Sequence, residues 1–418
     1  MLPSIFPLQA FLVPLAQNPW TYVVFGLIGF AFGFVLEISG FGNSKVLAAQ
    51  FYFKNLTVLK VMFGAIITAM VLIFLSSAVG ILDFNLVYVP ETHLWPGILG
   101  GLIMGVGFIV GGFCPGTALV SASTFKIDGI VFSLGALVGV WAFGETVQPY
   151  WDWWNNSGYY GRLTLMDVFH LPTGVVVLLV VLMALFMFWG GEKLEAIFGK
   201  KDLKKEPKKR IFGALAIIGV ALVVLFLGQP TSTEKWARIS SEKQAALDQR
   251  TVQVHPGELL ASLANKKLNI VMIDVRNEVD YNLFHITGAQ NIPLADLNAI
   301  TPWLLSQNST NLVVVLMSND EQAATDAWKF LVTEAVPNVY LLDGGINHWI
   351  TVFGKEDPAI HHARGVTAGS DLLQFSFEAA LGDRFEAAHP KPYEWTDLEF
   401  SPKIKLKLQR GPSGGGCG

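Results

Sequence analysis

Apolar positions divide the chain into a front part suited to a membrane and a rear part suited to water. A helix needs about 20 mainly apolar residues to cross a bilayer. Six stretches before residue 229 approach this length, the fourth being the shortest; they cover residues 20–38, 57–82, 95–113, 129–143, 172–190 and 211–228. We therefore expect a polytopic α-helical membrane domain over residues 1–228, with about six transmembrane helices.

The composition changes at residue 229, beyond which Asp, Glu, Asn and Gln become frequent. Strands that alternate with helices are typical of a parallel sheet. The segments concerned are β-rich at 268–275, 311–316 and 338–342 and helical at 322–332. The predicted divisions are a linker at 229–251, an α/β domain at 252–355 and an extension at 356–418, in which 375–383 is helical and 403–408 forms an edge strand.

Basic residues predict the orientation of the membrane domain. Residues 192–210 carry eight of them: Lys193, Lys200, Lys201, Lys204, Lys205, Lys208, Lys209 and Arg210. Cytoplasmic loops are enriched in Lys and Arg, and counting helices from this segment places four more on the same side: Lys45, Lys54, Lys60 and Lys126. The opposite side receives Arg162 alone, and residues 1–17 carry no basic residue that would indicate a signal peptide. Both termini and the α/β domain are therefore expected outside the cytoplasm.

The membrane part contains an internal repeat. Residues 33–35 (Gly-Phe-Val) and 40–43 (Gly-Phe-Gly-Asn) match residues 107–109 (Gly-Phe-Ile) and 114–117 (Cys-Pro-Gly-Thr) at a spacing of 74 residues. Each unit predicts a helix, a Gly-rich break, a short amphipathic run and another helix. Irregular backbone at membrane depth is tolerated where it lines a cavity, and helix N-termini there attract anions. Paired broken helices in repeated units are typical of transporters.

These residues carry a resemblance to a known family. The runs 111–118 and 126–129, with 40–43 and 50–52 of the first unit, resemble the YeeE/YedE (TsuA-like) family of sulfur-compound transporters. Its members carry thiosulfate inward, and cysteines at the helix breaks are thought to hand it along. The resemblance implies a set of substrate-contact residues: Cys114, Pro115, Gly116, Thr117, Gly40, Gly42 and Asn43.

The chain departs from the family in two ways. The 74-residue spacing places Gly40 where a first-unit cysteine would stand, so one chain cannot hold a relay of several cysteines. It also has two repeat units where larger members have more, so we expect a homo-oligomer or a second membrane subunit.

Four polar residues of the membrane part allow two interpretations each. Cys114 either contacts the substrate or packs between helices as a small buried residue. Thr117 and Asn43 either donate hydrogen bonds to an anion or cap the following helix. Glu37 is either an ionisable functional group in the membrane or a solvated residue at the interface.

The α/β part also carries a resemblance. Residues 273–276 (Ile-Asp-Val-Arg), 285–293 and 344–349 resemble the rhodanese domain in order and spacing, over about 252–352. Rhodaneses move sulfane sulfur through a persulfide on a cysteine after the central strand. Met317 stands at that place, and a thioether cannot form a persulfide.

The residues around Met317 also argue against catalysis. Residues 318–322 contain two acids, Asp320 and Glu321, and no base, so they would repel thiosulfate. The domain is therefore not expected to be a sulfurtransferase through this loop. Three further residues are interpreted as fold residues: Asp274, Arg276 and His285. His361, His362 and His389 show no metal-site spacing, and no metal or cofactor is expected.

The second of the two cysteines, Cys417, lies in the Gly-rich stretch 411–418. Gly-Gly-Cys-Gly at 415–418 resembles the Cys arm of the sulfur carrier SoxY, without its final Gly. Cys417 is either incidental in a frayed end or a mobile sulfur-carrier thiol, and the extended stretch from Gln409 to Cys417 would reach nearly 30 Å.

The sequence thus predicts a bacterial inner-membrane protein for uptake or handling of thiosulfate or a related sulfur anion. The α/β domain would be periplasmic and non-catalytic, and periplasmic sulfur-oxidation proteins are possible partners; no nucleic acid is expected. One alternative is a membrane-anchored scaffold that docks sulfur-oxidising enzymes. Another is a sulfurtransferase that uses Cys417.

Overall fold

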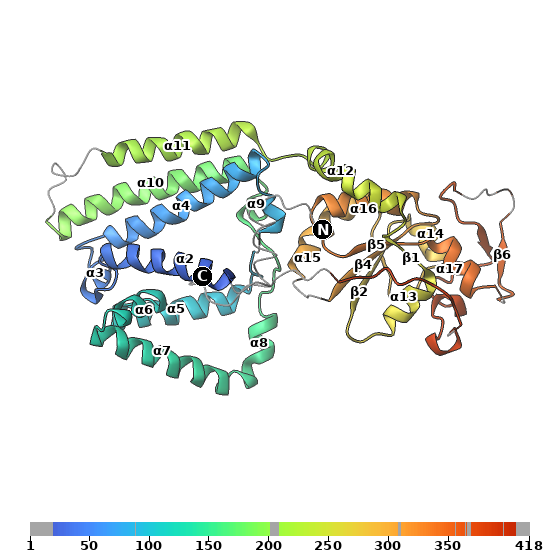
Figure 1. Cartoon of the computed structure of the whole chain (residues 1–418), viewed down its shortest axis with the longest axis horizontal. Helices are drawn as coiled ribbons and strands as arrows, with labels where there is room; N and C mark the ends of the chain where they lie inside the picture. Colours follow the sequence, from blue (N-terminus) through green and yellow to red (C-terminus); the bar gives the residue numbers. More distant parts are fainter. Residues whose placement is uncertain are drawn as a thin grey trace. The chain divides into compact units, whose positions relative to one another are not determined.

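The computed structural model describes residues 20–406, except 88, 201–208, 308–310, 356, 364, 366–368 and 396. These residues divide into two compact units, one of residues 20–87 and 91–230 and one of residues 89–90 and 231–406 (Figure 1). The carrier cysteine predicted at Cys417, with the SoxY-like stretch around it, lies outside the described residues. So do four of the basic residues used to predict orientation: Lys201, Lys204, Lys205 and Lys208.

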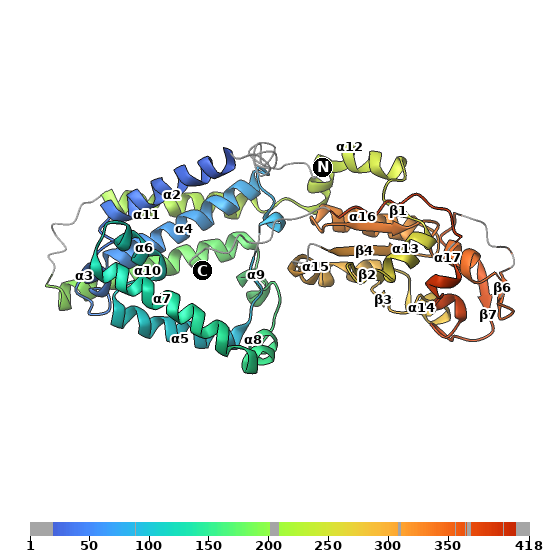
Figure 2. The ribbon, with the colours of Figure 1, turned by 60° about the horizontal axis from the view of Figure 1, so that its bottom comes forward.

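The first unit is helical throughout its regular structure, as predicted (Figure 2). Its helices are α2 (Trp20–Ile38), α3 (Ser44–Ala48), α4 (Thr57–Ala78), α5 (Leu94–Gly111), α6 (Pro115–Ser123), α7 (Ile127–Thr146), α8 (Trp151–Asn156), α9 (Leu165–Phe169), α10 (Thr173–Phe198) and α11 (Lys209–Leu227). Within the described residues, five helical stretches are long and apolar enough to cross a membrane, and a shorter apolar helix covers Tyr22–Ile38. The fourth predicted stretch lies in the 20-residue α7, so the prediction that it is the shortest was wrong.

Two buried clusters hold this unit together. Helices α4, α10 and α11 pack through a cluster of buried apolar residues: Val71, Phe74, Val177, Val181, Ala221 and Val224. The second cluster joins the two broken segments through Phe41, Leu47, Val58, Phe113 and Ala118. Most of α7 is exposed and apolar, which is the surface expected of a helix that faces lipid.

The second unit contains a five-stranded sheet in the order β1-β5-β4-β2-β3, and every neighbouring pair is parallel. The strands are β1 (Gln253–Val254), β2 (Asn269–Asp274), β3 (Gln290–Asn291), β4 (Leu312–Met317) and β5 (Val339–Leu342). This confirms the predicted α/β region with a small parallel sheet. The very short β1 and β3 were not predicted, because two residues carry no readable period.

Helices cover both faces of the sheet: α12 (Ser232–Asp248), α13 (Pro256–Leu263), α14 (Glu278–Leu283), α15 (Leu297–Ser306), α16 (Gln322–Thr333) and α17 (Gly345–Phe353). Side chains alternate along a strand, and all six of β4 are buried. Val313, Val315 and Met317 join the cluster that includes residues of α13 and α17. Their neighbours in β4 join the cluster that includes residues of α12, α15 and α16. The β4 strand is therefore apolar throughout.

The stretch 229–251, expected to be a linker, contains α12. A capping box between Thr231 and Glu234 starts this helix, Leu247 is buried in the core, and Lys235 pairs with Glu334 of the chain just after α16 at 2.9 Å. The helix is mostly polar, so its narrow apolar side was missed.

Two predictions for the extension were wrong. Residues 375–383 are not helical: β7 (Phe375–Phe377) pairs antiparallel with β6 (Ile360–His362). Residues 403–406, the described part of the predicted edge strand, form no strand. They are held by side chains instead, since Glu258 accepts from the Lys403 and Ile404 amides at 2.7 Å each.

Candidate functional site

Both repeat units break in the same way. The helix ends before a glycine in the left-handed region, Gly40 (φ 79°) or Gly112 (φ 71°), followed by a buried phenylalanine, Phe41 or Phe113. A side chain at such a φ is strained. Gly112 also lies against Ser44, whose Cβ would be 3.1 Å from an added Cβ. Each break therefore pins the chain between the two helices of its unit.

The residues that occupy equivalent places in the two breaks are not those that the 74-residue spacing predicts. Asn43 caps α3 by accepting from the Lys45 amide at 3.0 Å, and Cys114 caps α6 by accepting from the Thr117 amide at 3.4 Å. Measured from the left-handed glycines, Asn43 rather than Gly40 is the counterpart of Cys114. The predicted pairing of Gly40 with Cys114 was therefore wrong, because the first break contains one extra residue.

Cys114 and Thr117 form a reciprocal pair at the start of α6. The Cys114 amide donates to Thr117 Oγ1 at 3.0 Å, and the two side chains lie 3.2 Å apart between Sγ and Oγ1. Thr117 is buried, whereas Cys114 is partly exposed. Pro115 occupies the first helical position and Gly116 the second, where a missing N–H and a missing side chain are both tolerated. Thr117 and Asn43 thus cap helices, and the thiol lies at the positive end of α6.

Glu37 links the two repeat units of the membrane part. Lys126, just before α7, donates to Glu37 Oε1 at 2.8 Å, and both side chains pack over Gly42, where an added Cβ would collide with the carboxylate. Glu37 Oε2 is buried and has no hydrogen-bond partner in the described part of the chain. Glu37 is therefore paired, which neither earlier interpretation included.

A second ion pair fixes α10 against α4. The Glu195 carboxylate is fully buried, accepts from Lys60 Nζ at 2.7 Å and also accepts from the Leu56 amide. Burying a charge is costly unless it is paired and hydrogen-bonded. Both conditions are met here, so we interpret this pair as structural.

The loop between β4 and α16 (residues 318–321, the β4–α16 loop) is held on one side by α17. The Ile346 and Asn347 amides donate to the Ser318 and Asn319 carbonyls, each at 2.9 Å. The approach requires Gly345, which has φ 62° and would place an added Cβ inside the van der Waals radius of three loop carbonyls. Because these carbonyls accept hydrogen bonds from α17, the loop presents amides on its other side.

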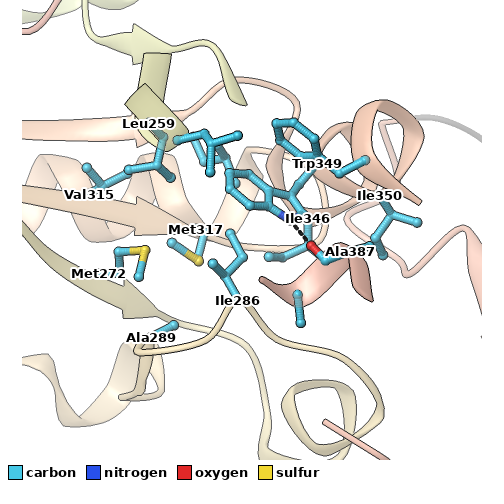
Figure 3. Packing of buried hydrophobic residues seen from close by; sticks show 14 of the residues in the cluster. Leu259, Met272, Ile286, Ala289, Val315, Met317, Ile346, Trp349, Ile350 and Ala387 are labelled. Carbon is cyan, nitrogen blue, oxygen red and sulfur yellow. Dashed lines mark hydrogen bonds between the residues drawn. The ribbon is translucent and has the colours of Figure 1, made fainter. Parts of the chain in front are cut away.

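Met317 lies in the core and not in this loop (Figure 3). It is fully buried at the end of β4, in the cluster with Met272, Ile286 and Trp349. Trp349 is itself held by a hydrogen bond from Nε1 to the Ala387 carbonyl at 2.8 Å. The thioether therefore contributes apolar packing.

The two acids of the β4–α16 loop are hydrogen-bonded to other segments of the chain. Asp320 accepts from the Gly369 amide at 2.7 Å and from Asn347 Nδ2 at 2.8 Å. Glu321 accepts from Arg250 at 2.6 Å. Arg250 follows α12, so the loop has a basic neighbour that its own sequence does not contain.

Arg250 belongs to a charged cluster with Asp343 and His348. A hydrogen bond from His348 and the guanidinium of Arg250 hold the pKa of Asp343 well below its usual range. The same hydrogen bond raises the pKa of His348. Burial lowers the pKa of His255, which faces His348 edge-on. These charges stabilise the region around the loop.

Asp274, Arg276 and His285 have structural partners, as expected of fold residues. Arg276 is buried and donates to Asp274, to the Phe284 carbonyl and to Asn319. His285 stacks on Tyr281 with centroids 3.8 Å apart. Among the described residues no group of three or more His, Cys, Asp or Glu could hold a metal ion.

Comparison with known families decides the class of the protein. The model of the sulphur transport family matches residues 38–269, more than half of the chain. The chain belongs to the sulphur transport family. This confirms the resemblance carried by the breaks, and a rhodanese-like domain matches residues 255–351, which confirms the second resemblance.

Individual relatives match a shorter part of this sulphur transport family protein than the family model does. A thiosulfate sulfurtransferase, GlpE of Pseudomonas fluorescens, is 30% identical over 96 residues, 22% of the chain and 82% of GlpE. A TBC domain-containing protein kinase-like protein of Gallus gallus is 31% identical over 26% of the chain, and a centrosomal protein of 41 kDa of Xenopus tropicalis is 30% identical over 24%. The chain spans only 13% and 26% of the length of these last two. A solved structure, the BH2092 protein of Bacillus halodurans, is 21% identical over 27% of the chain and 81% of its own, with a TM-score of 0.23.

Gly345, which lies against the β4–α16 loop, allows a test of how this loop is supported in the rhodanese-like unit. Gly345→Ala is expected to destabilise the unit by roughly 2 kcal/mol or more, because it adds left-handed strain and a clash with backbone. Thermal unfolding of the full chain in detergent, followed by circular dichroism, measures the effect. Gly365→Ala is the matched control, since Gly365 has φ 80° with open space around it. Equal shifts for both variants would show that the loop does not rest on Gly345.

Proposed function

We propose that this protein takes up thiosulfate or a related sulfur anion across the bacterial inner membrane. Membership of the sulphur transport family together with a rhodanese-like domain makes it a sulfur-related multi-pass membrane protein. The observation that carries the finer proposal is the cysteine cap of α6. It puts a partly exposed thiol and the positive end of a helix at one break in the membrane unit.

The break suits an anion that contains sulfur. Helix N-termini attract negative charge through their amides and dipole, and the polarisable Cys114 sulfur favours contact with another sulfur atom. The substrate-contact set then comprises Cys114, Pro115, Gly116 and Thr117, with Gly40, Gly42 and Asn43 supplying the matching break of the first unit. Because only two units are present, a second copy or another membrane subunit would complete the path.

We assign the rhodanese-like unit a non-catalytic role. Rhodanese chemistry needs a thiolate after the central strand, and the last residue of β4 is Met317, whose thioether is buried in the core. The match to a thiosulfate sulfurtransferase keeps an alternative open, a sulfurtransferase that uses Cys417. Cyanide-dependent thiosulfate turnover by the full chain in detergent would support that alternative.

We further propose that Cys417 is a sulfur-carrier thiol, on the SoxY-like sequence at 415–418. The chain leading to it is fixed at Lys405, whose amide donates to the Tyr340 hydroxyl at 2.9 Å. The twelve residues from Leu406 to Cys417 have a contour length of about 40 Å when extended. Partners on this side would be periplasmic sulfur-oxidation proteins.

Uptake of radiolabelled thiosulfate into proteoliposomes that contain the full chain tests the transport proposal. We expect time-dependent uptake above that of protein-free vesicles, reduced by excess unlabelled thiosulfate. Vesicles with correctly folded protein and no uptake would favour the alternative of a membrane-anchored scaffold for sulfur-oxidising enzymes.

The proposed orientation has its own test. Protease added to right-side-out spheroplasts is expected to digest the unit after Pro230 and to leave the membrane unit intact, because the basic segment 192–210 favours the cytoplasm. Immunoblots against tags on each unit report the cleavage. Digestion of the rhodanese-like unit only after lysis would reverse the orientation, and a cytoplasmic marker protein controls for leakage.

A further inference from the structure

The amide side of the β4–α16 loop is already occupied by a carboxylate of the same chain. The Asp320 amide donates to Asp371 Oδ1 at 2.7 Å, and the Ala323 amide donates to Asp371 Oδ2 at 2.8 Å. Asn319 Nδ2 adds a bond to the Asp371 carbonyl at 3.1 Å. Each carboxylate oxygen thus has its own backbone donor, an arrangement that suits a small oxyanion.

The contacts of the loop on its other side fix the orientation of these amides. Its carbonyls at Ser318 and Asn319 point to α17, which donates to them, and the loop leads directly into α16, a 12-residue helix. A helix N-terminus carries a partial positive charge. Asp371 therefore supplies the negative charge that the loop and helix favour.

Residues 369–374, here called the strap, hold Asp371 in this position. The Gly369 amide donates to Asp320 Oδ2 at 2.7 Å, and the Gln374 amide donates to Asn347 Oδ1 at 2.8 Å. Asn347 Nδ2 in turn donates to the Leu372 carbonyl at 2.9 Å. The Asp371 backbone lies at φ 50°, a conformation that costs a non-glycine residue about 1 kcal/mol or more. The strap contacts offset this strain.

We propose that the strap is a built-in competitor of the β4–α16 loop. Asp371 occupies the two-amide site as a carboxylate, so a sulfur oxyanion such as thiosulfate binds this loop only when the strap has moved away. A tethered competitor acts at a high effective concentration, of millimolar order for short connections. Free thiosulfate at lower concentration would therefore not displace it.

This explanation differs from simple charge repulsion by the loop acids. Glu321 is neutralised by Arg250, and the Asp320 carboxylate accepts from the strap and from α17. Neither needs to leave for an anion to reach the two amides. Asp371 does need to leave, because its oxygens are bonded to both.

Hydrogen–deuterium exchange of the full chain in detergent tests the proposal, read from peptides that cover 318–324 and 369–374. In wild type, we expect slow exchange at the loop that thiosulfate at about 0.1 mM, well below the effective concentration of the strap, does not change. Asp371→Ala is expected to raise exchange at the loop about tenfold, and thiosulfate should slow it again. Asp371→Asn, which keeps the side-chain shape without the charge, should give the same response if alanine disturbs the strap.

Asp326→Asn is the matched control, because this aspartate lies on α16 with an exposed side chain that pairs with Lys329 of the same helix. It should behave as wild type. Slower exchange of the wild-type loop with thiosulfate at about 0.1 mM would overturn the competitor role. If thiosulfate does not slow exchange of the loop in either Asp371 variant, the anion site is overturned. Transport is not measured, so failure here leaves the uptake proposal untouched.

Discussion

Replacing Cys114 by Ala is expected to lower thiosulfate uptake into proteoliposomes by at least about tenfold. This corresponds to about 1.4 kcal/mol less stabilisation of the transition state for transport. The change removes the only thiol among the described residues and the N-cap of α6 together. Cys114→Ser separates these two losses, because serine is a preferred N-cap but lacks the polarisable sulfur. We expect uptake by Cys114→Ser to be nearly as low as by Cys114→Ala.

Ser123→Ala, at the exposed end of α6, serves as the control and should transport normally. Initial rates are compared at equal amounts of reconstituted protein. A wild-type rate in both Cys114 variants would make the residue a packing and capping element. A wild-type rate in Cys114→Ser alone would assign its role to the cap and remove the sulfur contact from the proposal.

Local composition accounts for what the sequence predicted well. Apolar stretches long enough to cross a bilayer each fell in a helix, because no other structure satisfies a lipid-exposed backbone in one segment. The continuous apolar run of β4 and the helix that follows it were likewise readable. The rhodanese-like order of strands was carried by motifs that lie at strand ends.

The errors arose where one residue or one distant partner decides the structure. An alignment that matches Gly-Phe pairs at a constant spacing cannot detect the extra residue of the first break, so Gly40 was paired with Cys114. The partner of Glu37 lies 89 residues away. The partners of Asp320 and Glu321 were not predicted, because Gly369 and Arg250 belong to segments with no motif.

Met317 shows a further limit. Its place in the motif predicted the loss of a nucleophile, but the sequence did not show that the side chain fills the core. Met317→Ala would open a cavity, at a cost of about 2–5 kcal/mol. Met317→Leu, which nearly conserves volume and costs less than about 1.5 kcal/mol, is therefore the better neutral variant.

Cys417→Ser is expected to abolish any sulfur adduct on the protein and to impair growth on sulfur compounds, whereas Met317→Leu changes neither. Intact mass of the native protein detects the adduct, and tryptic peptides place it. An unperturbed cysteine, with a pKa of about 8.5, is only a few per cent thiolate at neutral pH. Loading is therefore expected to be slow for the purified chain with thiosulfate alone and faster with a partner enzyme.

Met317→Cys completes the comparison, because it restores a thiol at the end of β4. We expect little sulfurtransferase activity from it: the new side chain would lie in the core, and Asp371 would still occupy the loop amides. If Met317→Cys turns over thiosulfate strongly, the loop is accessible and the carrier thiol is not needed to explain sulfur handling. If the Cys417→Ser strain keeps both the adduct and normal growth, Cys417 carries no sulfur, and the adduct must then be sought on Cys114.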